Sequence, residues 1–598
     1  MLDDIFLNAD KLPALIEDYY PRTNQLKAAN LIGDALCNYK NLILEAPTGS
    51  GKTMAYLVPL FAQGRRVIIS TKTKQLMQQL YKKDIPVIKA LFGDRSVAVL
   101  KGRKNYLCPH RFMRWVYPNA IFYADVIEWY ERQQQESIIE VPRGMFDAGI
   151  TDKMSADSKQ CIYNKCQYYK TCPFYLAREA ANAANVIITN HHLVFSDIAM
   201  KLSKDSMGQV FNPVEHVVFD EAHSVADIFA VFAGIDISLK RIINSLEEHK
   251  DKLDFEKFTA LAKHYETLII KLADGKVLYD GVRELIYPFI DTCIELVRDA
   301  NDSDLKDEWT QWNDAFTELD SKHEDEGLRV AEKIRKDVTL RFMPLHVGDE
   351  LARGLDELTT SSIFVSATIA ANGSFDYFLR ETGLVNMVDA DNIKTMPPTF
   401  QMNQQALLYA PDIAHTEDEA KNKLISKLLQ SLDGSALVIC NSIKRMNNLV
   451  DALSIDMMHK KHVISQEDGD WEDFTSADDK VLVGCAMLRE GIDLARGNFR
   501  MVILDKLPFE YFKDLYYERK MKLVEDETGS SFNNYYLPRA VLYFKQAVGR
   551  LIRHESDKGL LVVLDNRITK QRYGKSFLQA ASGARVTNDF SEAIEFTR

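Results

Sequence analysis

The segment from residue 45 to residue 53 has the composition and order of a loop that binds phosphate. It reads Glu-Ala-Pro-Thr-Gly-Ser-Gly-Lys-Thr and lies between an apolar run, 41–44, and a segment with helical character, 54–61. Glycines let backbone N–H groups converge on phosphate oxygens, and the start of the helix adds partial positive charge. We therefore expect the loop to bind the phosphates of a nucleotide through Thr48, Gly49, Ser50, Gly51, Lys52 and Thr53.

Two side chains of this loop have specific expected roles. The Lys52 ammonium would pair with the β- and γ-phosphates, and the Thr53 hydroxyl would ligate Mg²⁺. The first position of the usual pattern holds Ala46 rather than glycine, so the pattern is met only in part. A glycine-rich turn without a ligand is the alternative, and the remaining motifs decide between the two.

Two adjacent carboxylates, Asp220 and Glu221, directly follow the apolar run 216–219. In parallel sheets, a carboxylate at the carboxyl end of a strand lies beside the phosphate-binding loop. We expect Asp220 to hold Mg²⁺ and Glu221 to orient and deprotonate the water that attacks the γ-phosphate. An ordinary helix start is the alternative reading of Asp-Glu-Ala-His. Its occurrence together with the phosphate loop favours catalysis.

Two arginines near the carboxyl end of the chain could complete such a site. Arg550 and Arg553 belong to a Gln-x-x-Gly-Arg-x-x-Arg pattern that begins at Gln546. Their i, i+3 spacing predicts a shared helix face. A guanidinium stabilises the charge of phosphoryl transfer, an effect of about 10³–10⁵ in rate. A solvated basic helix face is the alternative, but the complete pattern favours a catalytic role for Gln546, Arg550 and Arg553.

Four of the eight cysteines are grouped, and they predict a metal site. They are Cys108, Cys161, Cys166 and Cys172, with a proline after the last. Four thiolates can hold either a [4Fe–4S] cluster or a zinc ion, and the residues alone leave both open. The other four, Cys37, Cys293, Cys440 and Cys485, lie in apolar runs and are expected in the core.

The densest patch of basic and aromatic residues surrounds Cys108. Cations contact phosphates and rings stack on bases, so this composition suits a single nucleic-acid strand. The alternative is a solvated loop in which Phe112 and Trp115 form a local core. The expected contacts are Lys101, Arg103, Lys104, Tyr106 and Arg111, with Arg114 nearby.

Length and charge set limits on the class of protein. The chain has 598 residues and a net charge of −12. A prior of roughly 150 residues per domain predicts about four domains. The charge argues against a surface covered with cations, but a local basic channel is compatible with it. No apolar run reaches the roughly 18 residues of a membrane span, and the acidic start is unlike a signal peptide. We expect an intracellular, cytoplasmic protein with no membrane partner.

Apolar runs and helical segments alternate along the chain. This alternation predicts α/β lobes with doubly wound parallel sheets, which would position the residues above. Two stretches interrupt the first lobe: a Cys-rich one and, from about residue 237 to 347, one that we expect to be all helical. The expected strands are 41–46, 66–71, 96–100, 185–189, 216–219 and 362–365 in the first lobe, and 436–440, 480–484, 499–504 and 560–564 in the second.

In this order, the motifs resemble those of superfamily 2 helicases, in which Ser366-Ala367-Thr368 matches the segment that links ATP hydrolysis to strand separation. Further segments resemble the DinG/YoaA branch of the XPD-like helicases. They are Lys101 to Cys108, Ile188 to His191 and Lys506 to Phe509, together with Arg22-Thr23-Asn24-Gln25, which is similar to the family's adenine-reading segment, and Glu490-Gly491-Ile492-Asp493, which resembles its motif V. The resemblance implies that Arg22, Gln25 and Asp493 contact the nucleotide.

The resemblance also implies an architecture: two RecA-like lobes, with an iron–sulfur insertion and a helical arch insertion in the first. No exonuclease domain is expected before the helicase region. The expected boundaries are 1–102, 181–236 and 348–396 for the first lobe, 103–180 for the iron–sulfur domain, 237–347 for the arch and 397–598 for the second lobe.

The implied activity is that of an ATP-dependent DNA helicase using ATP with Mg²⁺ and a [4Fe–4S] cluster. The family implies 5′→3′ movement on single-stranded DNA, unwinding at single-strand/double-strand junctions, and work in DNA repair or at replication forks, where repair or replication proteins would be partners. Two alternatives stay open: an ATP-gated remodeller of nucleoprotein complexes, and a redox-responsive DNA-binding protein.

Overall fold

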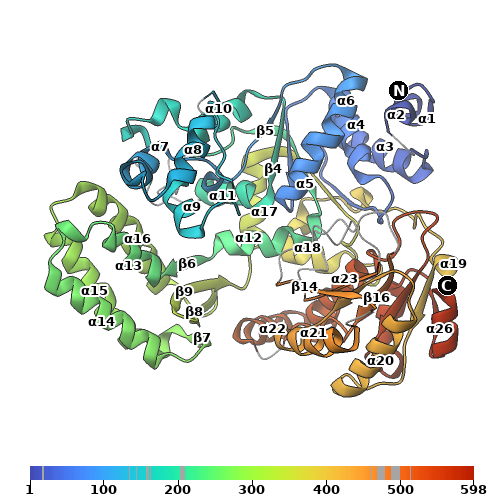
Figure 1. Ribbon diagram of the computed structural model, residues 1–598. Coiled ribbons are helices and arrows are strands. Elements are labelled where there is room, and N and C mark those ends of the chain that lie inside the picture. Colours follow the sequence, from blue (N-terminus) through green and yellow to red (C-terminus); the bar gives the residue numbers. More distant parts are fainter. Residues whose placement is uncertain are drawn as a thin grey trace.

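A computed structural model describes residues 1–597, apart from 17–18, 134, 143, 157–160, 162, 203–208, 458–459, 468–478, 486–498 and 512–513. The described part forms two α/β lobes, with two insertions in the first lobe (Figure 1). No described helix combines the length and the apolar character that crossing a membrane requires.

The first lobe is built on seven parallel strands in the order β11-β1-β10-β5-β2-β4-β3. Successive residues of a strand face opposite sides of the sheet. Leu42 and Leu44 therefore pack with helices α3 (Thr23–Cys37) and α4 (Lys52–Gln63), and Ile43 packs on the side of α11 (His191–Leu202) and α17 (Gly348–Leu358). The strands are β1 (Leu42–Glu45), β2 (Val67–Thr71), β3 (Val97–Val99), β4 (Val186–Asn190), β5 (Val214–Asp220), β10 (Thr359–Ser366) and β11 (Ile393–Thr395).

The second lobe repeats this plan with seven parallel strands in the order β14-β15-β13-β16-β17-β12-β18. One face packs against α23 (Leu537–Val548), and the other against α20 (Asp418–Ser431) and α21 (Ile443–Met457). The expected doubly wound fold is confirmed for both lobes. The strands are β12 (Ala406–Tyr409), β13 (Ser435–Ile439), β14 (His462–Ser465), β15 (Lys480–Gly484), β16 (Phe499–Leu504), β17 (Gly559–Val563) and β18 (Arg585–Thr587).

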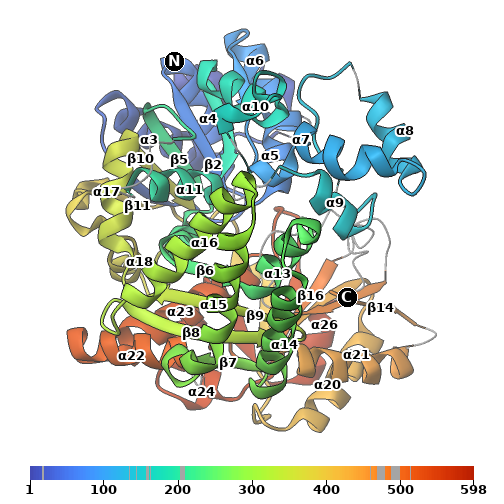
Figure 2. The ribbon, with the colours of Figure 1, turned by 90° about the vertical axis from the view of Figure 1, so that its left-hand side faces the viewer.

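The second insertion is not all helical, so that expectation is wrong. It holds a four-stranded antiparallel sheet beside its helices, and both project to one side of the lobes (Figures 1 and 2). In β9, Val338, Leu340 and Phe342 are buried and alternate with less buried polar residues, which is the period of a strand with one covered face. The elements are β6 (Ile235–Ser238), β7 (Gly275–Leu278), β8 (Gly327–Ile334), β9 (Asp337–Pro344), α13 (Leu239–Glu247), α14 (Phe255–Lys271), α15 (Arg283–Asp299) and α16 (Ser303–Ser321).

The Cys-rich insertion consists of short helices around a small apolar core of its own. Leu107, Phe112, Val126 and Met154 are almost fully buried there. The elements are α7 (Pro109–Arg111), α8 (Ala124–Arg132), α9 (Ala148–Met154) and α10 (Pro173–Ala183), the last of which packs on the first lobe.

The second lobe contains a buried charge cluster that allows a test of this fold. The Asp505 carboxylate is fully buried and accepts hydrogen bonds from Arg445 Nη2 at 2.7 Å and from Lys421 Nζ at 3.2 Å. Asp505→Ala would remove the buried counterion of both cations and leave them only the half-exposed Asp418 carboxylate. We expect the free energy of unfolding to fall by about 3–5 kcal/mol, measured by urea denaturation.

A matched control is Asp412→Ala, which removes an exposed ion pair with Lys570. This substitution should cost far less than Asp505→Ala, because water screens exposed pairs. Equal losses for the two variants would contradict the buried position of Asp505.

Candidate functional site

Three adjacent strand ends form the edge of the first sheet at which the candidate site lies. Strands β1, β10 and β5 are neighbours, and Val365 of β10 pairs with Leu44 on one side and with Asp220 on the other. Parallel strands present their carboxyl ends at one edge. The phosphate loop after β1, Ser366 at the end of β10 and Asp220 at the end of β5 therefore meet there.

The phosphate loop needs glycine at two positions. Gly49 and Gly51 both have a φ of +74°, a conformation that a Cβ disfavours. A Cβ on Gly49 would also lie 2.2 Å from Phe400 Cζ, and one on Gly51 would lie 2.1 Å from Gln25 Nε2. Lys52 is the first residue of α4, at the positively polarised end of that helix.

The segment expected to read adenine, residues 22–25, is hydrogen-bonded to the phosphate loop. Gln25 is buried; its Nε2 donates to the Gly51 carbonyl at 3.0 Å, and its Oε1 accepts from the Tyr19 hydroxyl at 2.8 Å. Neither Arg22 nor Gln25 is among the described residues that line the cavity between the lobes.

Asp220 is buried beside the loop. Its Oδ2 accepts a hydrogen bond from the Tyr56 hydroxyl at 3.1 Å, and its Oδ1 accepts one from the Glu221 amide at 3.0 Å. Burial and the neighbouring Glu221 carboxylate raise the pKa of Asp220 to about 6, although the Lys52 ammonium opposes this shift. A bound cation would stabilise the charged form of such a buried carboxylate, so Asp220 is suited to act as a metal ligand.

Glu221 has a strained backbone and a well-defined set of partners. Its φ of 59° is left-handed. Ser366 Oγ donates to Glu221 Oε2 at 3.0 Å, and His223 Nδ1 lies 2.8 Å from Ser366 Oγ and 3.4 Å from the same carboxylate oxygen. Burial alone would raise the pKa of Glu221, but Lys52 and the hydrogen bonds from His223 and Ser366 lower it. Glu221 is therefore ionised at neutral pH.

Two further groups near this edge are affected by burial. Burial lowers the pKa of Lys72 to about 8, even though Glu221 and Asp227 oppose the shift. Burial also lowers the pKa of His223, so its imidazole is less readily protonated than a free one. Both residues line the cavity.

The second lobe contributes Gln546, Arg550 and Arg553, but the two arginines do not share a helix face, so that expectation is wrong. Helix α23 ends at Val548, and the chain continues in turns with hydrogen bonds from the Arg550 amide to Ala547 and from the Leu551 amide to Val548. Glycine at 549 disfavours continuation of the helix. Both arginines nevertheless line the cavity.

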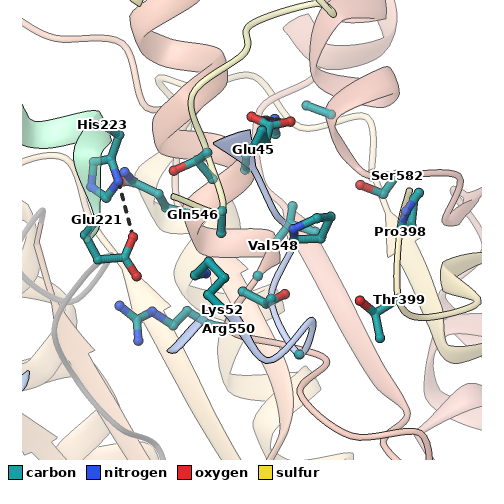
Figure 3. A pocket seen from close by; sticks show the side chains of 18 of the residues that line it. Glu45, Lys52, Glu221, His223, Pro398, Thr399, Gln546, Val548, Arg550 and Ser582 are labelled. Carbon is teal, nitrogen blue, oxygen red and sulfur yellow. Dashed lines mark hydrogen bonds and ion pairs between the residues drawn. The ribbon is translucent and has the colours of Figure 1, made fainter. Parts of the chain in front are cut away.

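A cavity of about 1050 Å³ lies between the lobes, and Figure 3 shows Lys52, Glu221, Gln546 and Arg550 gathered in one part of it. Residues from both lobes therefore face one enclosed space. Of the residues expected from the sequence, those lining it are Thr48, Gly49, Lys52, Glu221, Gln546, Arg550 and Arg553.

Three buried polar atoms at this site have no hydrogen-bond partner among the described residues. They are Ser50 Oγ of the phosphate loop, Gln546 Oε1 of the second lobe and Thr399 Oγ1 of the segment that connects the lobes. Buried polar groups in proteins are normally paired, so orphaned ones indicate a missing partner. Their places in the loop and across from it fit a polar ligand such as a nucleotide.

Sequence reasoning missed two charged residues that join the lobes at this site, Glu45 and Lys545. Lys545 Nζ donates to both carboxylate oxygens of Glu45 at 2.9 Å and to the Ala370 carbonyl at 3.0 Å. The only signal in the sequence was adjacency, since Glu45 precedes the loop and Lys545 precedes Gln546.

Phe400 was also missed. Its ring covers Gly49 from the segment that connects the lobes, and no sequence pattern pointed to it.

The four grouped cysteines lie in one neighbourhood. Burial raises the pKa of Cys108 to about 11, and Cys161 and Cys172 add to the shift; burial and the same two residues raise the pKa of Cys166. All four are free thiols. Within the described part of the chain, no three His, Cys, Asp or Glu side chains are arranged as a metal site. The donor chemistry of four neighbouring thiols fits an all-sulfur ligand set.

The other cysteines only partly match expectation. Cys293 and Cys440 are buried in the core as expected, but Cys37 is exposed. It is the last residue of α3, where the helix turns toward solvent.

The basic patch is less open than expected, and the expectation of a ring available for base stacking is wrong for Tyr106, whereas Arg111 lines a cavity beside the second insertion. Tyr106 is 1% exposed and its hydroxyl accepts from the Lys101 amide at 3.0 Å, while Arg111 is 9% exposed and donates to the Asp152 carbonyl at 3.0 Å. Tyr106 is drawn into the core of the first lobe, where its ring packs 5.7 Å from the ring of Phe174.

The remaining basic residues of the patch differ in surroundings. Lys101 pairs with Glu140, and the Arg103 guanidinium stacks 4.4 Å from the centre of the Phe174 ring. Lys104 is exposed. Asp493, expected at the nucleotide, lies outside the described residues.

Comparisons with known proteins agree with the helicase resemblance of the sequence motifs. Family profiles match three parts of the chain: DEAD/DEAH box helicase at residues 22–107, DEAD_2 at 150–242 and Helicase C-terminal domain at 425–583. The chain is 27% identical to the ATP-dependent DNA helicase YoaA of Haemophilus influenzae, over 99% of this chain and 98% of that protein. It is 28% identical to YoaA of Escherichia coli, over 100% and 99%.

A solved XPD helicase structure shares the fold, with a TM-score of 0.60 at 16% identity over 96% of this chain and 100% of that one. The motif order, the two lobes and these full-length matches agree. Over nearly its whole length this chain is therefore similar to ATP-dependent DNA helicases named YoaA and DinG, and it shares its fold with a solved XPD helicase structure.

Proposed function

We propose that this chain is an ATP-dependent DNA helicase, whose two lobes bind and hydrolyse ATP between them and so drive movement along single-stranded DNA. The observation that carries this proposal is the cavity in which Lys52 and Glu221 of the first lobe face Gln546, Arg550 and Arg553 of the second. The names of the YoaA relatives support DNA as the nucleic acid.

The residues of the cavity suggest how the reaction proceeds. Lys52 and the loop amides would hold the phosphates, and Mg²⁺ held by Thr53 and Asp220 would neutralise phosphate charge. The ionised Glu221, fixed by Ser366 and His223, would orient the attacking water. Arg550 and Arg553 would stabilise the transition state from the second lobe, so hydrolysis requires the lobes to meet.

We extend the proposal to a [4Fe–4S] cluster held by Cys108, Cys161, Cys166 and Cys172. The donor set contains four thiols, which suits such a cluster or zinc, and the family favours the cluster. Ligation requires thiolates, so the raised pKa of Cys108 describes the thiol before it binds metal. The cluster would cross-link segments 108 and 161–172 and hold the insertion on the first lobe.

The finer parts of the proposal concern the DNA. We infer 5′→3′ movement, unwinding at single-strand/double-strand junctions, and work in repair or at replication forks. The acidic second insertion faces the Cys-rich insertion across a cavity of about 340 Å³, where Lys165 pairs with Asp307 at 3.3 Å. That arrangement supports a bounded passage for a strand between the two insertions.

Lys52→Ala should lower the rate of ATP hydrolysis by at least about 10²-fold, because it removes the ammonium expected on the β- and γ-phosphates. Phosphate release in the presence of single-stranded DNA measures the effect. Lys82→Ala removes an exposed lysine of the same lobe and should leave the rate unchanged. Turnover by Lys52→Ala at the normal rate would refute the site.

Cys108→Ser should abolish bound iron and sulfide and the brown colour of protein purified without oxygen, because a cluster needs all four thiolates. Ultraviolet–visible spectra and metal analysis test this. Cys37→Ser, which changes an exposed cysteine outside the set, should keep the full cluster. A colourless native protein that contains zinc would rule the cluster out.

Forked DNA with a 5′ single-stranded tail should be unwound, and the same duplex with only a 3′ tail should not. The family's polarity gives this expectation, and a strand-displacement assay on matched substrates measures it. Unwinding from the 3′ tail would reverse the inferred polarity. ATP hydrolysis without strand separation on either substrate would favour the ATP-gated remodeller.

A further inference from the structure

The Glu45–Lys545 ion pair is a contact between the lobes that lies next to the catalytic motifs. Glu45 ends β1 immediately before the phosphate loop, and Lys545 lies in the last turn of α23 immediately before Gln546. The pair therefore joins a residue next to the loop with a residue next to the arginines, across the cavity between the lobes.

Every polar atom of this pair is used. The Lys545 ammonium has three N–H donors and three oxygen partners, the two oxygens of Glu45 and the Ala370 carbonyl. Glu45 Oε2 also accepts from the amides of Ile369 and Ala370, each at 2.7 Å. The side chains are 18% and 8% exposed, so water screens the pair little. It holds a single geometry, unlike a mobile surface ion pair.

The pair gathers three catalytic segments at one carboxylate. Glu45 belongs to the end of β1, the amides of Ile369 and Ala370 follow Ser366-Ala367-Thr368, and Lys545 belongs to the second lobe. Close by, a Cβ on Gly549 would lie 3.2 Å from Thr48 Cγ2, so the backbone after α23 rests directly on the phosphate loop. Two contacts thus fix the end of α23 against the loop, one on each side of Gln546.

We propose that Glu45 and Lys545 are positioning residues that set Gln546, Arg550 and Arg553 in register with the phosphate loop. Neither side chain acts on the phosphates; the pair determines where the second lobe's groups stand when the lobes meet. Loss of the pair should therefore lower the rate of hydrolysis much more than the affinity for the nucleotide. The first lobe alone supplies the loop and Lys52 that bind the phosphates. This inference rests on the proposed function.

Another ion pair between the lobes provides a matched comparison. Lys520 Nζ of α22 (Leu515–Thr528) lies 3.1 Å from Glu381 Oε2 of α18 (Asp376–Thr382), with side chains 5% and 15% exposed. It is as buried as the Glu45–Lys545 pair, but neither residue lines the nucleotide cavity. Loss of Lys520 weakens the contact between the lobes without disturbing the register of the arginines.

The test compares Lys545→Met, Glu45→Gln, their double variant and Lys520→Met in the full-length protein. We expect kcat for DNA-stimulated ATP hydrolysis to fall about 10²-fold in Lys545→Met, as for a misplaced catalytic group. The dissociation constant of a fluorescent ATP analogue should stay unchanged. The double variant should be no slower than the slower single variant, because the two residues act through one contact. Lys520→Met should keep its kcat.

Amide hydrogen exchange provides a readout that does not need turnover. Ile369, Ala370 and residues 549–553 should exchange faster in Lys545→Met and Glu45→Gln, and at the wild-type rate in Lys520→Met. An unchanged kcat in Lys545→Met, additive losses in the double variant, or unchanged exchange at these amides would overturn the inference. Wild-type protein without ATP hydrolysis would instead refute the proposed function, and the exchange data would still decide whether the pair holds the segment.

Discussion

The Glu45 carboxylate is the constraint on which the catalytic arrangement depends. It accepts two amides from the segment after β10 and the ammonium of Lys545 from the second lobe. Removing one partner of such a buried pair leaves an uncompensated charge, at a cost of about 3–5 kcal/mol. One side chain thus binds together the end of β1, the Ser-Ala-Thr segment and α23.

Sheet topology explains why residues so far apart in sequence act together. The order β1-β10-β5 places three strand ends side by side, although two insertions separate them along the chain. This strand order places Asp220 and Ser366 at the site. The left-handed backbone at Glu221 is tolerated at the same edge, because Ser366 and His223 fix its side chain. The insertions add surfaces at a distance while the sheet keeps its register.

The sequence was informative where a pattern is local. Strands such as β1 and β5 contain continuous apolar runs that the sequence predicts, and the positions of the loop and of Asp220 follow from the ends of these two runs. Strands β11, β14 and β18 lie at sheet edges and contain only one or two apolar residues each, so no apolar run marks them in the sequence. Apolar and polar residues do alternate along β9. The strand lies among charged helical segments in the sequence, so the whole stretch is predicted to be helical. The burial of Tyr106 and the pairing of Glu45 with Lys545 depend on tertiary contacts, which no single-sequence pattern encodes.

The electrostatics of the two carboxylates divides their roles and shows where catalysis is controlled. Burial and Glu221 raise the pKa of Asp220, whereas Lys52, His223 and Ser366 lower that of Glu221. An ionised carboxylate with a low pKa is a weak base, but it still accepts hydrogen bonds. Glu221 is therefore better suited to orienting water than to removing its proton. Phosphoryl transfer needs little base, since its transition state is dominated by charge on the phosphoryl oxygens. In the proposed mechanism, Arg550 and Arg553 would meet that charge from the second lobe. Control of the rate would then lie in how closely the second lobe approaches, and hence in the contacts that fix that approach.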